Sequence, residues 1–118
     1  MFSFYEVAMV MLLHWVADFI LQTLKQSRNK SKSNKYLTAH VATYTAILFL
    51  MCFRLGLLNG SIWALVNGAA HWCTDWATSR MTSHLWTKGD VHNFFVVIGF
   101  DQMIHLLTLL ATYLYFRA

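Results

Sequence analysis

The sequence has no proline, two cysteines and five acidic residues in 118 positions. Without proline, nothing in the chain forces a kink into a helix. A glycine-rich phosphate loop, a Cys-x-x-Cys metal clip and a Ser/His/Asp nucleophile arrangement are also missing. Dinucleotide or nucleoside-triphosphate chemistry is therefore unsupported.

Charge is scarce and apolar residues are abundant. Of all residues, 12% are charged and 58% are hydrophobic, whereas soluble proteins average about 25% charged residues. A helix needs about 20 apolar residues to cross a hydrocarbon core of ~30 Å. Four stretches approach this length, at about residues 2–24, 36–58, 62–79 and 93–116. The sequence predicts an all-α membrane protein, a four-transmembrane-helix bundle that forms one domain over residues 1–118.

The third of these stretches, 62–79, is the shortest and the most polar, since it contains Asn67, His71 and Asp75. A re-entrant or interfacial segment is the alternative to a spanning helix here. Gly68 and the two alanines after it favour a spanning helix, because small residues let the helices of a membrane bundle approach closely.

A basic loop at residues 25–35, "KQSRNKSKSNK", predicts the orientation. It carries five lysines and arginines and no acid, as cytoplasmic loops do under the positive-inside rule. This predicts a multi-pass protein of the bacterial inner membrane with both termini outside. The loop also suits anionic lipid headgroups. No nucleic-acid-reading motif accompanies it, so we expect no nucleic-acid partner.

The polar residues inside the predicted helices form a pattern. Three of the five acids lie within these stretches, and each has a histidine four positions away: His14/Asp18 in "HWVAD", His71/Asp75 in "HWCTD" and Asp101/His105 in "DQMIH". Residues four apart share one helix face. The order reverses in the last helix, which runs in the opposite direction to the other two. The aspartates then lie at about 6–12 Å from the cytoplasmic end and the histidines at about 12–18 Å.

His40 of the second predicted helix falls at the depth of the aspartates. All four helices can therefore contribute to one polar layer near the cytoplasmic side. An aspartate at a helix centre costs about 2.5–3.5 kcal/mol on the insertion scale, so three facing lipid would cost about 7–10 kcal/mol. These groups must face one another, a water-filled cavity, a bound cation or shared protons.

The run "LLHWVADFILQ", followed by the basic loop, "TAHV", "HWCTDW" and "DQMIHLL", resembles the bacterial membrane-protein family catalogued as domain of unknown function 3307. The resemblance covers essentially the whole chain and implies a polytopic fold, without supplying a reaction. A looser similarity exists to small membrane-bound metal-dependent hydrolases. The Gly-His-Arg and Thr-His-Ser signatures of that group are absent from this sequence.

A metal site is the first hypothesis for this layer, because imidazole and carboxylate suit a divalent metal, zinc first and iron or manganese as alternatives. The candidate ligands are His14, Asp18, His40, His71, Asp75, Asp101 and His105. The three aspartates are also the candidate catalytic residues, since a carboxylate that does not bind the metal can act as a general base. A layer open to the cytoplasmic leaflet favours a lipid headgroup or another phosphate ester as the substrate of a hydrolase.

Two alternatives explain the same residues. Intramembrane Asp/His chains are typical of proton relays, and a unit with four helices would need a homo-oligomer to conduct protons or cations or to act as a holin-like protein. The pairs can also be a structural polar core without catalysis, in which each interhelical contact is worth about 0.6 kcal/mol.

Overall fold

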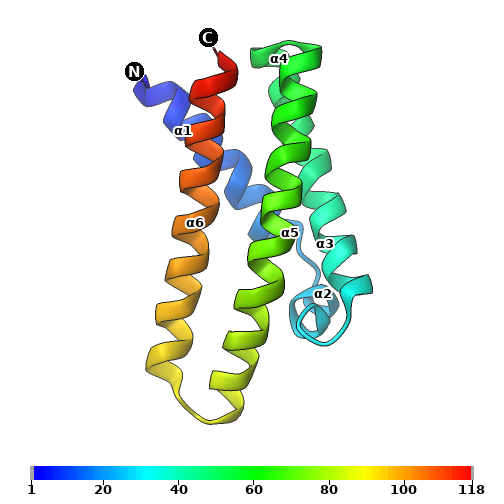
Figure 1. Ribbon diagram of the computed structural model, residues 1–118, viewed down its shortest axis with the longest axis vertical. Helices are drawn as coiled ribbons and strands as arrows, with labels where there is room; N and C mark the ends of the chain where they lie inside the picture. The colour runs from blue at the N-terminus through cyan, green and yellow to red at the C-terminus, as the bar shows by residue number, and fades with distance from the viewer. Residues whose placement is uncertain (1, 118) are drawn as a thin grey trace.

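The computed structural model describes residues 2–117, and every regular element in that range is helical (Figure 1). The elements are α1 (Phe4–Trp15), a π-helical segment (Val16–Ile20), α2 (Leu24–Asn29), α3 (Asn34–Leu48), a 3-10 turn (Phe49–Met51), α4 (Cys52–Leu55), α5 (Leu57–Thr87) and α6 (Val91–Arg117). The all-α prediction is confirmed. α5 and α6 form a long antiparallel hairpin, α3 lies along α5, and α1 crosses the bundle obliquely (Figure 1).

The first predicted stretch, 2–24, is not one continuous helix. α1 gives way to a π-helical turn, in which the Leu21 N–H bonds to the Val16 carbonyl at 3.0 Å. A separate helix, α2, then begins, because Thr23 and Gln26 form a reciprocal capping box with bonds of 3.1 and 3.2 Å. The turn between them carries Asp18, and π-helical turns are frequent at functional sites.

The helix α5 begins earlier than the predicted stretch 62–79. The turn expected between the predicted stretches 36–58 and 62–79 is made instead by Gly56, whose φ of 90° is a conformation that favours glycine. The chain is helical again from Leu57, because nothing in the Leu-Leu-Asn-Gly-Ser run requires an irregular backbone. The predicted turn was therefore placed a few residues too late.

The same helix also ends later than expected. Most of the connection expected between the predicted stretches 62–79 and 93–116 is helical, up to Thr87, because residues 80–87 contain neither glycine nor proline. Gly89, at a φ of 76°, makes the turn, and Asp90 accepts a hydrogen bond from the Asn93 N–H at 3.2 Å. The side chain and backbone of Asn93 hold the pKa of Asp90 below its usual value.

A close approach between α5 and α3 explains one of the predicted small residues. A Cβ atom added to Gly68 would clash with the Thr45 side chain of α3. The small residue thus brings the two helices together at the level just above the His/Asp pairs, one turn before His71.

The apolar core fills the part of the bundle between the buried His and Asp residues and the end at which both chain termini lie (Figure 1). Trp63 and Tyr113 are fully buried in it, their ring centroids lie 6.4 Å apart, and the Trp63 indole N–H donates to the Leu109 carbonyl at 3.2 Å. Cys52 and Cys73 are both free thiols.

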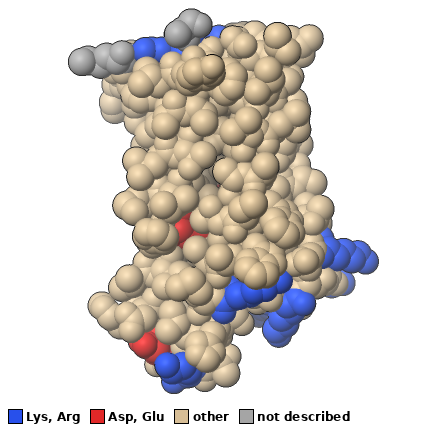
Figure 2. All heavy atoms as spheres, in the orientation of Figure 1, with Lys and Arg blue, Asp and Glu red and all other residues tan. Residues whose placement is uncertain are grey.

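Large apolar side chains also cover much of the outer surface; Phe53, for example, is 96% exposed. On the face drawn in Figure 2, a broad band with hardly any charged atoms separates basic residues at the two ends of the molecule. Two helical stretches, Asn34–Leu55 and Val91–Arg117, are long and apolar enough to cross a membrane by length and composition. The length and composition of the observed helices thus support two of the four predicted membrane-spanning stretches.

Candidate metal centre

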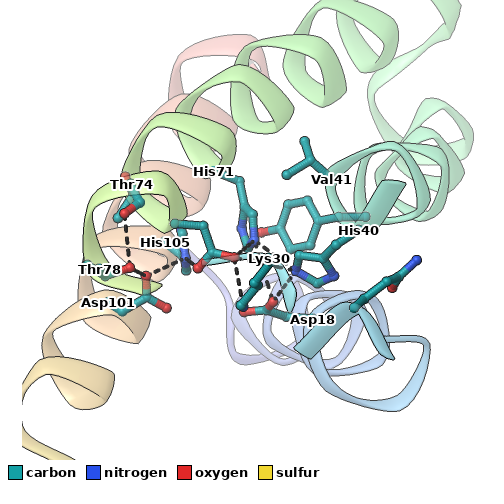
Figure 3. Close-up of polar contacts among 12 residues, drawn as sticks. Asp18, Lys30, His40, Val41, His71, Thr74, Thr78, Asp101 and His105 are labelled. Carbon is teal, nitrogen blue, oxygen red and sulfur yellow. Dashed lines mark hydrogen bonds and ion pairs between the residues drawn. The ribbon is translucent and has the colours of Figure 1, made fainter. Parts of the chain in front are cut away.

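Four parts of the chain place acidic and imidazole side chains at one point inside the bundle (Figure 3). The π-helical segment supplies one aspartate, α3 one histidine, and α5 and α6 one histidine and one aspartate each. These six residues are Asp18, His40, His71, Asp75, Asp101 and His105, and all are buried. Six of the seven candidate ligands predicted from the sequence therefore come together across the four helical segments.

The tightest group consists of Asp18, His40 and His71. The His40 Nε2 atom lies 2.9 Å from Asp18 Oδ1 and 3.2 Å from His71 Nε2, and His71 Nε2 lies 3.5 Å from the same aspartate oxygen. Three donor atoms from three separate elements thus form a nearly equilateral triangle. In a tetrahedral zinc site with ligands at about 2.0–2.1 Å, neighbouring donors are about 3.3 Å apart.

Asp75 lies beside this triangle, one helical turn after His71 on α5. Its Oδ2 atom is 3.5 Å from His71 Nε2 and 3.8 Å from His40 Nε2, while Oδ1 is 3.8 Å from His105 Nε2. The same Oδ2 atom accepts a hydrogen bond of 2.8 Å from the Lys30 ammonium. Asp75 therefore connects the triangle, the His105 ring and the basic loop.

Asp101 forms the far edge of the cluster with His105. Its carboxylate accepts hydrogen bonds from Thr78 Oγ1 at 2.6 Å and from Gln102 Nε2 at 3.1 Å. His105 Nε2 lies 3.1 Å from Asp101 Oδ1. The His105 ring stacks on His71, with centroids 3.9 Å apart and planes 16° apart, which fixes the directions in which both rings point.

His14 lies next to the cluster, where its Nε2 atom is 3.7 Å from Asp18 Oδ2, and both ring nitrogens also contact other residues. Its Nε2 atom lies 2.7 Å from Gln102 Oε1 and its Nδ1 atom 3.0 Å from the Tyr44 hydroxyl. The Gln102 amide donates from Nε2 to Asp18 Oδ2 at 3.2 Å. His14 Nε2 must then donate to Gln102, and Tyr44 must donate to His14 Nδ1. His14 is thus linked to Asp18 through Gln102 as well as by its own 3.7 Å contact.

Three overlapping groups in the described residues can hold a metal ion: Asp18 with His40 and His71, His71 with Asp75 and His105, and Asp18 with Asp101 and His105. In each group the candidate ligand atoms lie within 4.8 Å of one another. Two of the groups offer two imidazoles and one carboxylate, which is a donor set suited to zinc or ferrous iron. The buried His105 Nε2 atom makes no hydrogen bond, although it lies 3.1 Å from Asp101 Oδ1 and 3.8 Å from Asp75 Oδ1, so it can serve as a ligand together with these carboxylates. The residues present fit a divalent metal.

Tyr44, Lys30 and Thr78 contact this centre and were not predicted from the sequence. The Tyr44 ring packs against His71, with centroids 4.0 Å apart and planes tilted by 31°. Its position one turn after His40 on α3 was the signal that could have indicated it. Lys30 reaches Asp75 from the basic loop, 45 positions away. No local pattern marks one of the loop's five basic residues for that contact.

Comparisons with known proteins place the chain in a family. A stretch of 62 residues, 52% of this chain, is 32% identical to H(+)/Cl(-) exchange transporter 5 of Sus scrofa, and it spans 8% of that protein's length. No solved structure matches the chain. The family model described as "Protein of unknown function (DUF3307)" matches residues 7–118. The chain therefore belongs to the DUF3307 family, as the resemblance of its motifs implied.

Proposed function

We propose that this protein is a multi-pass protein of the bacterial inner membrane that binds a divalent metal ion, zinc first, among its buried His/Asp residues. In this proposal the metal serves the hydrolysis of a lipid or another phosphate ester at the cytoplasmic side. The observation that carries the proposal is the triangle of Asp18 Oδ1, His40 Nε2 and His71 Nε2, with sides of 2.9, 3.2 and 3.5 Å. These separations suit ligands of one tetrahedral ion.

The connectivity of the helices supports a bundle with four crossings. α3 and α6 each follow a polar loop on the same side, and α5 runs antiparallel to both between them (Figure 1). If the apolar stretches Asn34–Leu55 and Val91–Arg117 both cross outward, α5 must cross back. The segment from Phe4 to Ile20 then supplies the fourth crossing, and both termini lie outside. The basic loop lies inside, as the positive-inside rule requires.

The charges of the cluster favour a bound cation. Asp18, Asp75 and Asp101 are all buried. Among the lysines and arginines of the described residues, Lys30 forms an ion pair with one of them, Asp75. Carboxylates removed from water without a matching positive charge are unfavourable. A divalent cation would offset the remaining negative charge.

In hydrolysis the metal would supply Lewis acidity at a phosphoryl oxygen. Asp18, His40 and His71 would hold it, with Asp75 as the fourth ligand. Asp101 would accept the proton of the attacking water, because Thr78 and Gln102 fix its carboxylate at 2.6 and 3.1 Å and His105 lies 3.1 Å away to share that proton.

Elemental analysis of the detergent-purified protein by inductively coupled plasma mass spectrometry tests the metal. We expect near-stoichiometric zinc, iron or manganese, lost in His71→Gln and Asp75→Asn. The matched controls are His84→Gln, on the same helix but exposed, and Asp90→Asn, in the turn after that helix; both should keep the metal. Wild-type protein that holds no metal and takes up none on addition would overturn the proposal. Proton flux in liposomes would then test the conduction alternative.

A further inference from the structure

A cavity of about 760 Å³ lies directly in front of the metal centre, and the carboxylates of Asp18, Asp75 and Asp101 line its inner end. Its volume is in the range of pockets that bind small organic molecules, about 300–1,000 Å³. It is far larger than a metal ion or an inorganic phosphate requires. The remaining lining therefore indicates what the cavity holds.

One wall of the cavity is basic. Arg28, Lys30 and Lys32 line it from the end of α2 and the turn that follows. The capping box at Thr23 begins α2 with bonds of 3.1 and 3.2 Å, so the direction of this short basic segment is set by the fold. Arginine and lysine side chains converging on one space are typical of phosphate sites.

Lys30 stands between the buried carboxylates and the cavity. Its side chain is 17% exposed, while that of its partner Asp75 is 3% exposed. Figure 3 shows Lys30 extending in among Asp18 and the histidines. The ammonium can reach an anion in the cavity with a small rotation of its flexible chain.

The opposite wall is apolar and aromatic. Trp86 at the end of α5 and Phe95 on α6 line the cavity, although they are 60% and 61% exposed. Phe94 also lines it and contacts the Trp86 ring, with centroids 5.0 Å apart. An anion without an apolar part would leave these side chains without a partner.

We infer that this cavity binds a phosphorylated amphiphile, with its phosphate monoester among Arg28, Lys30 and Lys32 and its apolar tail along Trp86, Phe94 and Phe95. Its role as the substrate rests on the proposed hydrolase function, whereas binding itself does not require the metal. Phosphate draws Lys30 away from Asp75 into the cavity. The Ser and Thr hydroxyls on the facing side of α5, Ser79, Thr82 and Ser83, can donate to the remaining phosphate oxygens.

The test is equilibrium binding of a fluorescent short-chain phosphatidic acid to the full-length protein in detergent with EDTA. Unlabelled phosphatidic acid should compete. Phosphatidylcholine of the same chain length should compete at least about tenfold less well, because it lacks a phosphate monoester. Glycerol 3-phosphate should also compete at least about tenfold less well, because it lacks a tail. If glycerol 3-phosphate competes as well as the lipid, the proposal of an amphiphilic ligand is overturned, and the cavity binds a free phosphate ester.

Variants locate the site. Lys30→Met and Arg28→Gln should each weaken binding about tenfold, because each removes a charged hydrogen-bond donor to the phosphate. Lys35→Met removes the same charge from the same loop, but Lys35 does not line the cavity, so its affinity should change less than twofold. Equal losses of affinity in Lys35→Met and Arg28→Gln would overturn the proposal, because binding would then depend only on the net charge of the loop. Metal content, measured separately, reports on the proposed function and not on this cavity.

Discussion

The Lys30 ammonium lies 2.8 Å from Oδ2 of Asp75, at the edge of the buried His/Asp cluster. That oxygen also lies 3.5 Å from His71 Nε2 and 3.8 Å from His40 Nε2. Lys30 therefore holds the oxygen that a metal ion would need as its fourth ligand. In the proposed site the lysine and the metal would compete for Asp75, and the lysine and a phosphate would share the cavity.

Lys30→Met should make the metal-free protein less stable and bind zinc more tightly. Loss of the ammonium leaves the buried Asp75 oxygen without its hydrogen bond, which costs about 1–3 kcal/mol in the free energy of unfolding. The same loss removes the competitor, so zinc affinity should rise about fivefold or more. Thermal unfolding in detergent with EDTA and zinc titration against a chromophoric chelator measure the two effects. Lys35→Met should change neither, and weaker zinc binding in Lys30→Met would contradict the competition.

His14→Ala should weaken metal binding without abolishing it. His14 acts on Asp18 through Gln102, with contacts of 2.7 and 3.2 Å, and loss of an outer partner typically costs about 10–100-fold in metal affinity. Gln102→Ala should have a similar effect, and the double variant should lose little more. Saturating zinc should still bind stoichiometrically to these variants, as titration would show. Complete loss of zinc in His14→Ala would make His14 a direct ligand.

Gly68→Ala should destabilise the bundle by about 1–3 kcal/mol, the usual cost of overpacking. The added Cβ would clash with Thr45 on α3, so the two helices would have to separate just above the polar cluster. Thermal unfolding in detergent measures the change. Adding Thr45→Ala to Gly68→Ala should restore part of the lost stability. Gly99→Ala is the matched control, since a Cβ there meets nothing within 4 Å; it should be neutral or stabilising. Equal losses at both positions would argue against the close approach.

Thiol labelling of intact cells should give the orientation. In a background of Cys52→Ala and Cys73→Ala, Leu57→Cys should react with a membrane-impermeant maleimide from outside, because Leu57 lies at the exposed α4–α5 turn. Lys35→Cys, in the basic loop, should react only after the cells have been permeabilised. The reverse pattern would invert the topology, and labelling of both positions in intact cells would contradict the crossing of α3.

The sequence predicted much of this centre because the information was local. A histidine and an aspartate four apart share a helix face whatever the tertiary structure, and the reversed order in "DQMIH" follows from the antiparallel course of α6. The helix ends were less predictable. The glycines at 56 and 89 fix the turns through their positive φ angles, and the sequence alone left those turns misplaced.

The sequence by itself determined the helical class, the apolar surface and the three i, i+4 His/Asp pairs, since composition and helical periodicity depend on neighbours in the chain. The tertiary structure alone decided that His14 bonds to Tyr44 and Gln102, and that Lys30 is the lysine of the basic loop that reaches Asp75. The reason is geometric. The rotation and crossing angle of each helix determine which polar atoms meet. A long lysine side chain can reach many partners, and the tertiary packing determines which one it contacts.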